Sequence, residues 1–106
     1  MLNRIEHARV RTTGDRVLVL RRHGIARDLD IMNALEAAGA FVIGTPGGFK
    51  YAKPDAKAGC WMRPAPDAVF VLDAFGRADL DPLSRAYFDA HYEIIPALAV
   101  IDGGDA

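Results

Sequence analysis

The predicted fold follows from a pattern that occurs twice, as VLVLRRHGIARDLD in residues 17–30 and as VFVLDAFGRADLD in residues 69–81. Each segment begins with four apolar residues typical of a β-strand, continues to a glycine and ends in Asp-Leu-Asp. When residues 15–30 are aligned with residues 67–81, with one gap opposite Arg27, nine of the fifteen paired positions are identical. We interpret the two segments as copies of one folding unit.

Each copy leads into a predicted helix and a second strand. The first copy predicts a helix over residues 30–38 and a strand over 41–43, and the second predicts a helix opening at Asp81 and a strand over 97–101. The last aspartate of each copy, Asp30 or Asp81, is expected to cap its helix by accepting backbone N–H groups. The sequence therefore predicts two βαβ units, an internal repeat of residues 15–44 and 67–102.

An additional strand and a linker complete the predicted chain. Residues 4–11 are expected to form an N-terminal strand, joined to residues 17–20 by a turn at 12–15. Residues 45–66 are rich in Gly, Pro and Lys and predict either a small hairpin or a loop.

Two folds accommodate two βαβ units in residues 1–106, taken as a single domain. One is a doubly wound parallel sheet with helices on both faces. The other is a ferredoxin-like α+β fold, with both helices on one face of a mainly antiparallel sheet. We predict the ferredoxin-like fold with an extra N-terminal strand, because only two helices are expected and the linker has hairpin signals rather than a third helix.

Composition indicates an ordinary globular protein of the cytoplasm. The 106 residues are 51% hydrophobic and 25% charged, which argues against global disorder. No apolar run approaches the roughly 20 residues that span a bilayer, and the charged N-terminus does not resemble an export signal. The single cysteine, Cys60, cannot form an internal disulfide, which is typical of a reducing compartment.

Charge is distributed unevenly along the chain. Residues 1–27 contain seven arginines and two acidic residues, whereas residues 67–106 contain eight acidic residues and two arginines. Such a division predicts either that the two ends meet in the fold or that two faces attract different partners.

Four carboxylates are the candidates for a metal site. A right-handed crossover between strands 69–72 and 97–101 would bring Asp73 and Asp102 to the edge where the second helix begins, near Asp79 and Asp81. Oxygen ligands of this kind suit Mg²⁺ or Ca²⁺. Helix capping and solvated loops are the alternative roles, and we favour them over a metal.

Aromatic and basic side chains alternate in the central linker and predict a binding surface. Lys50, Tyr51, Trp61 and Arg63 are suited either to nucleic acid, by stacking and phosphate contact, or to a protein partner. A net charge of −1 makes nucleic acid the less favoured partner. We predict a protein-docking surface that includes these residues, with Asp79 and Asp81 as an acidic part.

A further similarity concerns the segment RRHGIARDLDIMNALEAAGAFVI, residues 21–43. It resembles the first βα unit of ACT-type regulatory domains, with a glycine after the strand and a helix ending in Ala-Gly. It differs in two extra residues before the helix and in His23, where that family has proline. The resemblance implies amino-acid binding near Gly24 and the helix start, commonly across a dimer.

No catalytic constellation is evident, because Cys60 and the three histidines are scattered along the chain. We therefore predict a non-enzymatic protein–protein interaction module without a cofactor, acting as an inhibitor, adaptor or subunit. The alternative is an ACT-like domain that responds to a small ligand or a metal. A homodimer is compatible with both hypotheses.

Overall fold

The computed structural model describes residues 5–22, 24–57 and 59–96. Their strands and helices, in chain order, are β1 (Glu6–Val10), β2 (Arg16–Arg21), α1 (Asp28–Ala37), β3 (Phe41–Thr45), β4 (Gly48–Ala52), β5 (Val69–Leu72), α2 (Arg85–His91) and β6 (Tyr92–Ile94). Among these residues, no helix has the length and apolar character needed to cross a membrane.

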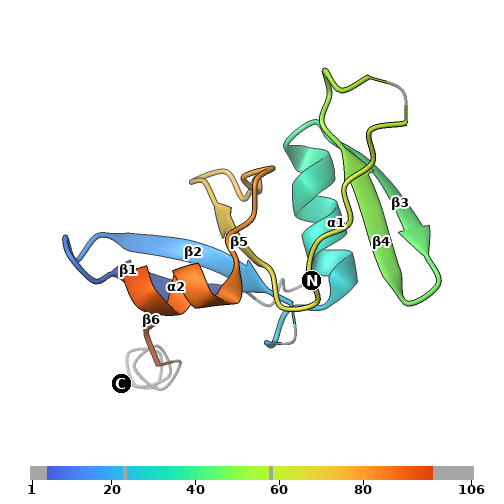
Figure 1. The fold of residues 1–106 in the computed structure, drawn as a ribbon. Helices are drawn as coiled ribbons and strands as arrows, with labels where there is room; N and C mark the ends of the chain where they lie inside the picture. Colours follow the sequence, from blue (N-terminus) through green and yellow to red (C-terminus); the bar gives the residue numbers. More distant parts are fainter. Residues whose placement is uncertain (1–4, 23, 58, 97–106) are drawn as a thin grey trace, which may run out of the picture.

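The strands form two separate sheets. β5, β2, β1 and β6 make an antiparallel four-stranded sheet in that order, and β3 pairs with β4 in a hairpin of its own. In Figure 1, α1 lies between the hairpin and the four-stranded sheet, and α2 lies beside β1 and β2. The chain is a small α+β domain.

The predicted ferredoxin-like pair of βαβ units is wrong. β2 and β3, the strands of the first unit, belong to different sheets. α1 and α2 pack against opposite faces of the β2–β5 strand pair rather than against one face. The physical reason is the turn at Pro46-Gly47, where Gly47 adopts a φ of 80°. This turn reverses the chain directly after β3 and pairs one edge of β3 with β4. β2 pairs with β1 on one edge and with β5 on the other, so it has no edge left for β3.

The two similar sequence segments nevertheless meet, because their strands are neighbours. β2 pairs antiparallel with β5, and Val19 lies opposite its repeat equivalent Val71. Alternation along the strands then sorts the side chains by face. Leu18, Leu20, Phe70 and Leu72 pack into the cluster that contains α1 and the hairpin, whereas the valines at 17, 19, 69 and 71 join the cluster around Phe88 of α2. Both faces of this strand pair are therefore covered.

The helix caps differ from the prediction. α1 begins at Asp28, and the Asp30 carboxylate accepts a hydrogen bond from the Arg27 backbone N–H at 3.0 Å. α2 begins at Arg85 rather than near Asp81, and Ser84 Oγ caps it by accepting from the Tyr87 N–H at 3.1 Å. The predicted strand over residues 97–101 lies outside the described residues.

Ion pairs join the two ends of the chain, as the charge distribution had suggested as one alternative. Arg9 on β1 contacts Glu93 on β6 at 3.2 Å, and Arg11 Nε donates to the Asp89 carbonyl at 3.2 Å. Arg21 forms a two-pronged, largely buried pair with Glu6 at 2.7 Å, and this hydrogen bonding raises the pKa of Arg21. The Arg9–Glu93 pair therefore joins the two oppositely charged ends of the sequence within one sheet.

Arg22 links the four-stranded sheet to the remainder of the fold. Its side chain is 11% exposed. The guanidinium binds both carboxylate oxygens of Asp28 at 3.0 and 3.1 Å and donates to the carbonyls of Pro64 and Ala65. It also lies 5.2 Å from the centroid of the Phe49 ring on β4. One side chain thus holds together the end of β2, the start of α1, the hairpin and the segment before β5.

Replacement of Phe88 by alanine is expected to destabilise the protein by about 3–5 kcal/mol, because it removes the ring that attaches α2 to the sheet. Phe88 is 1% exposed, contacts the cluster of Ala8, Val19 and Val69, and stacks on Tyr92 with centroids 5.1 Å apart. Urea unfolding would measure the change. Tyr87→Ala, on the exposed side of the same helix, is the control and should change stability by no more than about 0.5 kcal/mol.

Candidate functional site

The β3–β4 hairpin has one covered and one open face. The register places Phe41 opposite Ala52 and Ile43 opposite Lys50, so these four side chains share one face. The other face carries Val42, Phe49 and Tyr51, which pack into the cluster that contains α1. We call the first of these the outer face.

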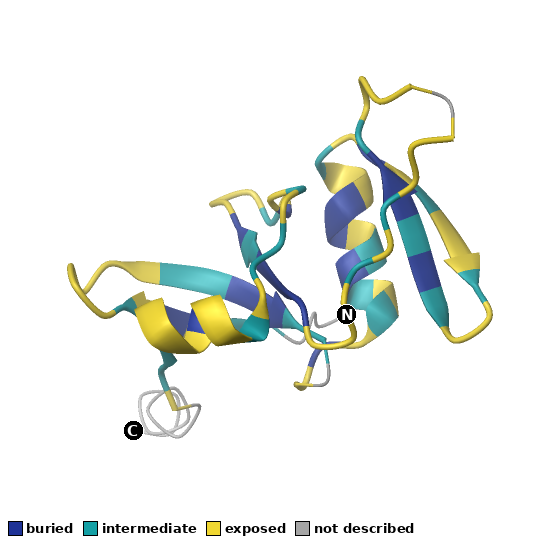
Figure 2. Ribbon diagram, viewed as in Figure 1, coloured by how far each residue is buried: buried dark blue, intermediate teal, exposed yellow. Residues whose placement is uncertain are grey.

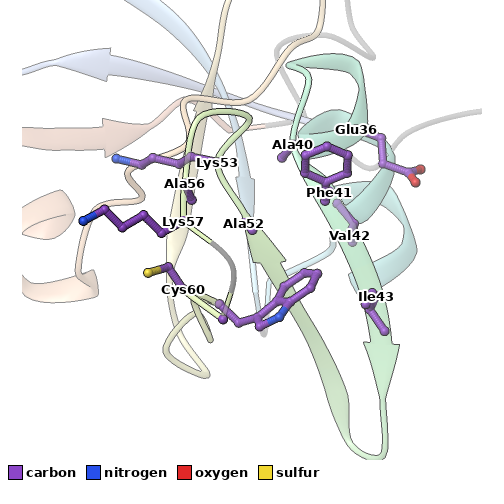
Figure 3. A pocket seen from close by; sticks show the side chains of 12 residues that line it. Glu36, Ala40, Phe41, Val42, Ile43, Ala52, Lys53, Ala56, Lys57 and Cys60 are labelled. Carbon is purple, nitrogen blue, oxygen red and sulfur yellow. The ribbon is translucent and has the colours of Figure 1, made fainter.

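Large apolar side chains remain exposed at the outer face. Phe41 is 61% exposed, Ile43 45% and Trp61 36%, and Figure 2 shows the exposed parts of β3 in yellow. The three side chains line a single cavity of about 610 Å³. Figure 3 shows this cavity between β3 and the segment that carries Lys53, Lys57 and Cys60. An exposed apolar group of this kind is characteristic of a binding surface.

Positive charge lies along one side of the cavity. Lys50 Nζ lies 5.0 Å from the centroid of the Trp61 ring, a cation–π contact that orients the indole. Lys53 and Lys57 also line the cavity and, in Figure 3, extend to the side opposite Glu36. Residues 41–63 contain four basic residues and one acidic residue. The outer face is therefore an apolar surface with a basic rim.

Lys53 is the one of these lysines that forms an ion pair among the described residues. Its Nζ lies 2.8 Å from the Asp81 carboxylate, and this hydrogen bond raises the pKa of Lys53. Asp81 therefore neutralises part of the basic rim.

Tyr51, a predicted docking residue, is placed in the core. It is fully buried, packs edge-on against Phe70 at 6.2 Å, and donates its hydroxyl hydrogen bond to the Leu80 carbonyl at 2.7 Å. Burial, with the nearby charges of Asp81 and Asp79, raises the pKa of Tyr51 to about 12. Its aromatic ring thus stabilises the fold and is covered by neighbouring residues.

The other predicted docking residues separate into two places. Lys50 and Trp61 meet at the outer face, whereas Arg63 and Asp81 line a second cavity of about 360 Å³ beside Ser84. Asp79 is exposed and its carboxylate accepts the Asp81 backbone N–H at 3.0 Å. Phe41 and Ile43 were missed as site residues, because Phe41-Val42-Ile43 is equally compatible with a strand buried on both faces.

The carboxylates proposed as metal ligands have local partners. Asp73 accepts from the backbone N–H groups of Phe75 and Arg77 at 2.8 and 2.9 Å and pairs with the Arg77 guanidinium at 2.7 Å, and these bonds lower the pKa of Asp73. Within residues 5–22, 24–57 and 59–96, no three His, Cys, Asp or Glu side chains come close enough together to hold a metal ion. Asp102 lies outside the described residues.

Two further residues were considered from the sequence, Cys60 and Gly24. Cys60 is exposed and lines the outer-face cavity. Gly24 follows β2 close to the Arg21–Glu6 pair, but β2 and β3 do not share a sheet, so the βαβ unit that the ACT-like similarity implied is not formed.

Tyr51→Phe is expected to lower stability at neutral pH by about 1 kcal/mol, because the part-buried Leu80 carbonyl loses its donor. The raised pKa of Tyr51 also makes the stability of the protein depend on pH. Tyr51 contributes stability that is complete below its ordinary pKa of 10 and is lost as the pH rises towards about 12. Chemical unfolding at a series of pH values should show a decline over this interval that is smaller in Tyr51→Phe and unchanged in Tyr87→Phe.

Comparison with known proteins adds no relative to this description. No protein-family model, no curated protein and no solved structure matches the chain.

Proposed function

We propose that this chain is a non-enzymatic protein-binding module that docks an acidic segment of a partner protein on the outer face of the β3–β4 hairpin. The observation that carries the proposal is the set of three exposed apolar side chains, Phe41, Ile43 and Trp61, around one cavity. Aromatic side chains at the centre of an interface commonly supply most of its binding energy.

The partner's chemistry follows from the rim of the cavity. Lys57 lines the cavity, and Lys50 lies beside it with its Nζ 5.0 Å from the centroid of the Trp61 ring. An apolar side chain of the partner would enter the cavity, while acidic neighbours would pair with the lysines. Electrostatic attraction of this type accelerates association and weakens as salt increases.

Trp61→Ala is expected to weaken partner binding by about 2 kcal/mol, or roughly thirtyfold, because it removes the anchoring ring. Lys50→Glu is expected to weaken it by about tenfold or more, because it places a carboxylate in front of an acidic segment. The measurement is capture of the same partner from native lysate by the immobilised chain and by each variant, followed by titration with the purified partner.

Tyr87→Ala is the matched control, since Tyr87 is an exposed aromatic residue on α2 and does not line the cavity. The proposal requires that Tyr87→Ala bind normally, that Trp61→Ala and Lys50→Glu bind weakly, and that added salt reduce wild-type binding. Equal capture by all four proteins would place the docking surface elsewhere and refute the proposal.

A small apolar ligand is the second candidate occupant, favoured by the volume of the cavity. About 610 Å³ lies within the range of small-molecule sites, and most of the lining residues are apolar. Thermal-shift measurements against a panel of apolar and aromatic amino acids would test it. A ligand present at 100 times its dissociation constant should add about 2.7 kcal/mol of stability, and Trp61→Ala should abolish that gain. Absence of any shift would exclude these ligand classes.

A further inference from the structure

β3 presents a free edge to the surroundings. Tyr51 on β4 exchanges both backbone hydrogen bonds with Met62, at 3.0 and 2.7 Å, so its backbone groups point away from β3. Val42 lies opposite Tyr51. Opposed residues of two antiparallel strands are alternately hydrogen-bonded and non-hydrogen-bonded, and Val42–Tyr51 is a non-hydrogen-bonded pair. The N–H and C=O of Val42 therefore also point away from β4. The same alternation turns the backbone of Gly44 outward. In the described part of the chain, neither residue has a backbone partner on that side.

This edge lacks the features that usually prevent strands from pairing. Natural edge strands are protected by charged side chains, prolines, bulges or a covering segment. β3 has the sequence Phe-Val-Ile-Gly-Thr, with no charge and no proline, and it pairs with β4 in unbroken register over all five residues. The edge is thus chemically distinct from the basic rim of the outer face, and a neutral strand suits it better than an acidic segment does.

We propose that the edge binds a second copy of this chain, with the two β3 strands antiparallel about a twofold axis at Ile43. In this register Val42 of each copy lies opposite Gly44 of the other, and each such pair exchanges both outward-facing hydrogen bonds. The two hairpins then form one continuous four-stranded sheet. Twofold pairing of this kind needs only one self-complementary surface.

Neighbouring registers leave an outward-facing carbonyl of Val42 or Gly44 without a donor. Centring the axis on Val42 would place Gly44 opposite Ala40, whose N–H is already bonded to the Leu35 carbonyl at 3.1 Å. Centring it on Gly44 would place Val42 opposite Pro46, which has no N–H to donate. The axis at Ile43 alone satisfies the outward groups of both residues.

The same side of α1 adds apolar surface to this contact. Met32 reaches β3, with its Cε 3.8 Å from the position that a Cβ on Gly44 would occupy. Leu29, one helical turn earlier, shares the Met32 side of the helix and is 62% exposed. In the paired arrangement Leu29 and Met32 of the two copies approach each other beneath the joined sheet.

Pairing through the edge is independent of the partner-binding proposal, because it leaves the outer face of each hairpin open. If Trp61→Ala loses partner capture but keeps the mass of the dimer, the result tests the outer face alone. If a variant loses the dimer but still captures the partner, the result tests the β3 edge alone.

The first experiment is cysteine cross-linking in a Cys60→Ser background. Ile43→Cys lies on the proposed axis in a non-bonded pair, where Cα atoms are about 4.5 Å apart and a disulfide fits. Under mild oxidation it should form a covalent dimer that reductant dissociates. Val42→Cys, which lies opposite Gly44, should form no covalent dimer under the same conditions. Equal or greater cross-linking at position 42 would overturn the proposed register.

The second experiment measures mass by sedimentation over a dilution series. Wild type and Gly44→Ala should have twice the mass of one chain at high concentration, whereas Gly44→Pro should be monomeric because it lacks the outward N–H donor. Gly44→Pro loses no bond to β4, so circular dichroism should show a folded chain. Leu29→Lys, an exposed change on α1, should also weaken the dimer. A wild type that is monomeric throughout, or a Gly44→Pro variant that dimerises normally, would overturn the proposal.

Discussion

The antiparallel pairing of β2 with β5 is the constraint on which the rest of the structure depends. It places Leu20 and Phe70 on one face of the central strand pair and Val19 and Val71 on the other, so that each face needs its own cover. α2 covers the valine face through Phe88, while α1 and the hairpin cover the leucine and phenylalanine face. A strand pair that is apolar on both sides becomes stable only when two different elements pack against it.

The β3–β4 hairpin differs from the β2–β5 strand pair, because only one of its faces is covered. Phe49 and Tyr51 bury their rings against α1 and the four-stranded sheet, and Arg22 ties the hairpin to β2 and to α1. Its outer face retains exposed apolar side chains, and its β3 edge retains unpaired backbone groups. The part of the molecule that completes the core is therefore also the part with surface left to bind another molecule.

Several features were predictable from local pattern. Strands at β2, β3 and β5 follow from short apolar runs bounded by turn residues, and β1 follows from apolar residues interspersed with arginines. α1 follows from its apolar spacing and the glycine at 39. Lys50 and Trp61 were predicted together and do meet. Tyr51 belongs to the core instead, because strand alternation turns it to the face opposite Lys50, and a tyrosine is compatible with either environment.

The sequence by itself determined where β1, β2, β3, β5 and α1 would form and that residues 17–20 resemble residues 69–72, because these depend on composition and short-range spacing. Only the tertiary structure decided that the two similar strands pair with each other, that the Pro46-Gly47 turn diverts β3 into a separate hairpin, and that Phe41 and Ile43 stay exposed. Those outcomes depend on which distant surfaces cover one another, and the local periodicity of a strand is the same whether its partner is near or far along the chain.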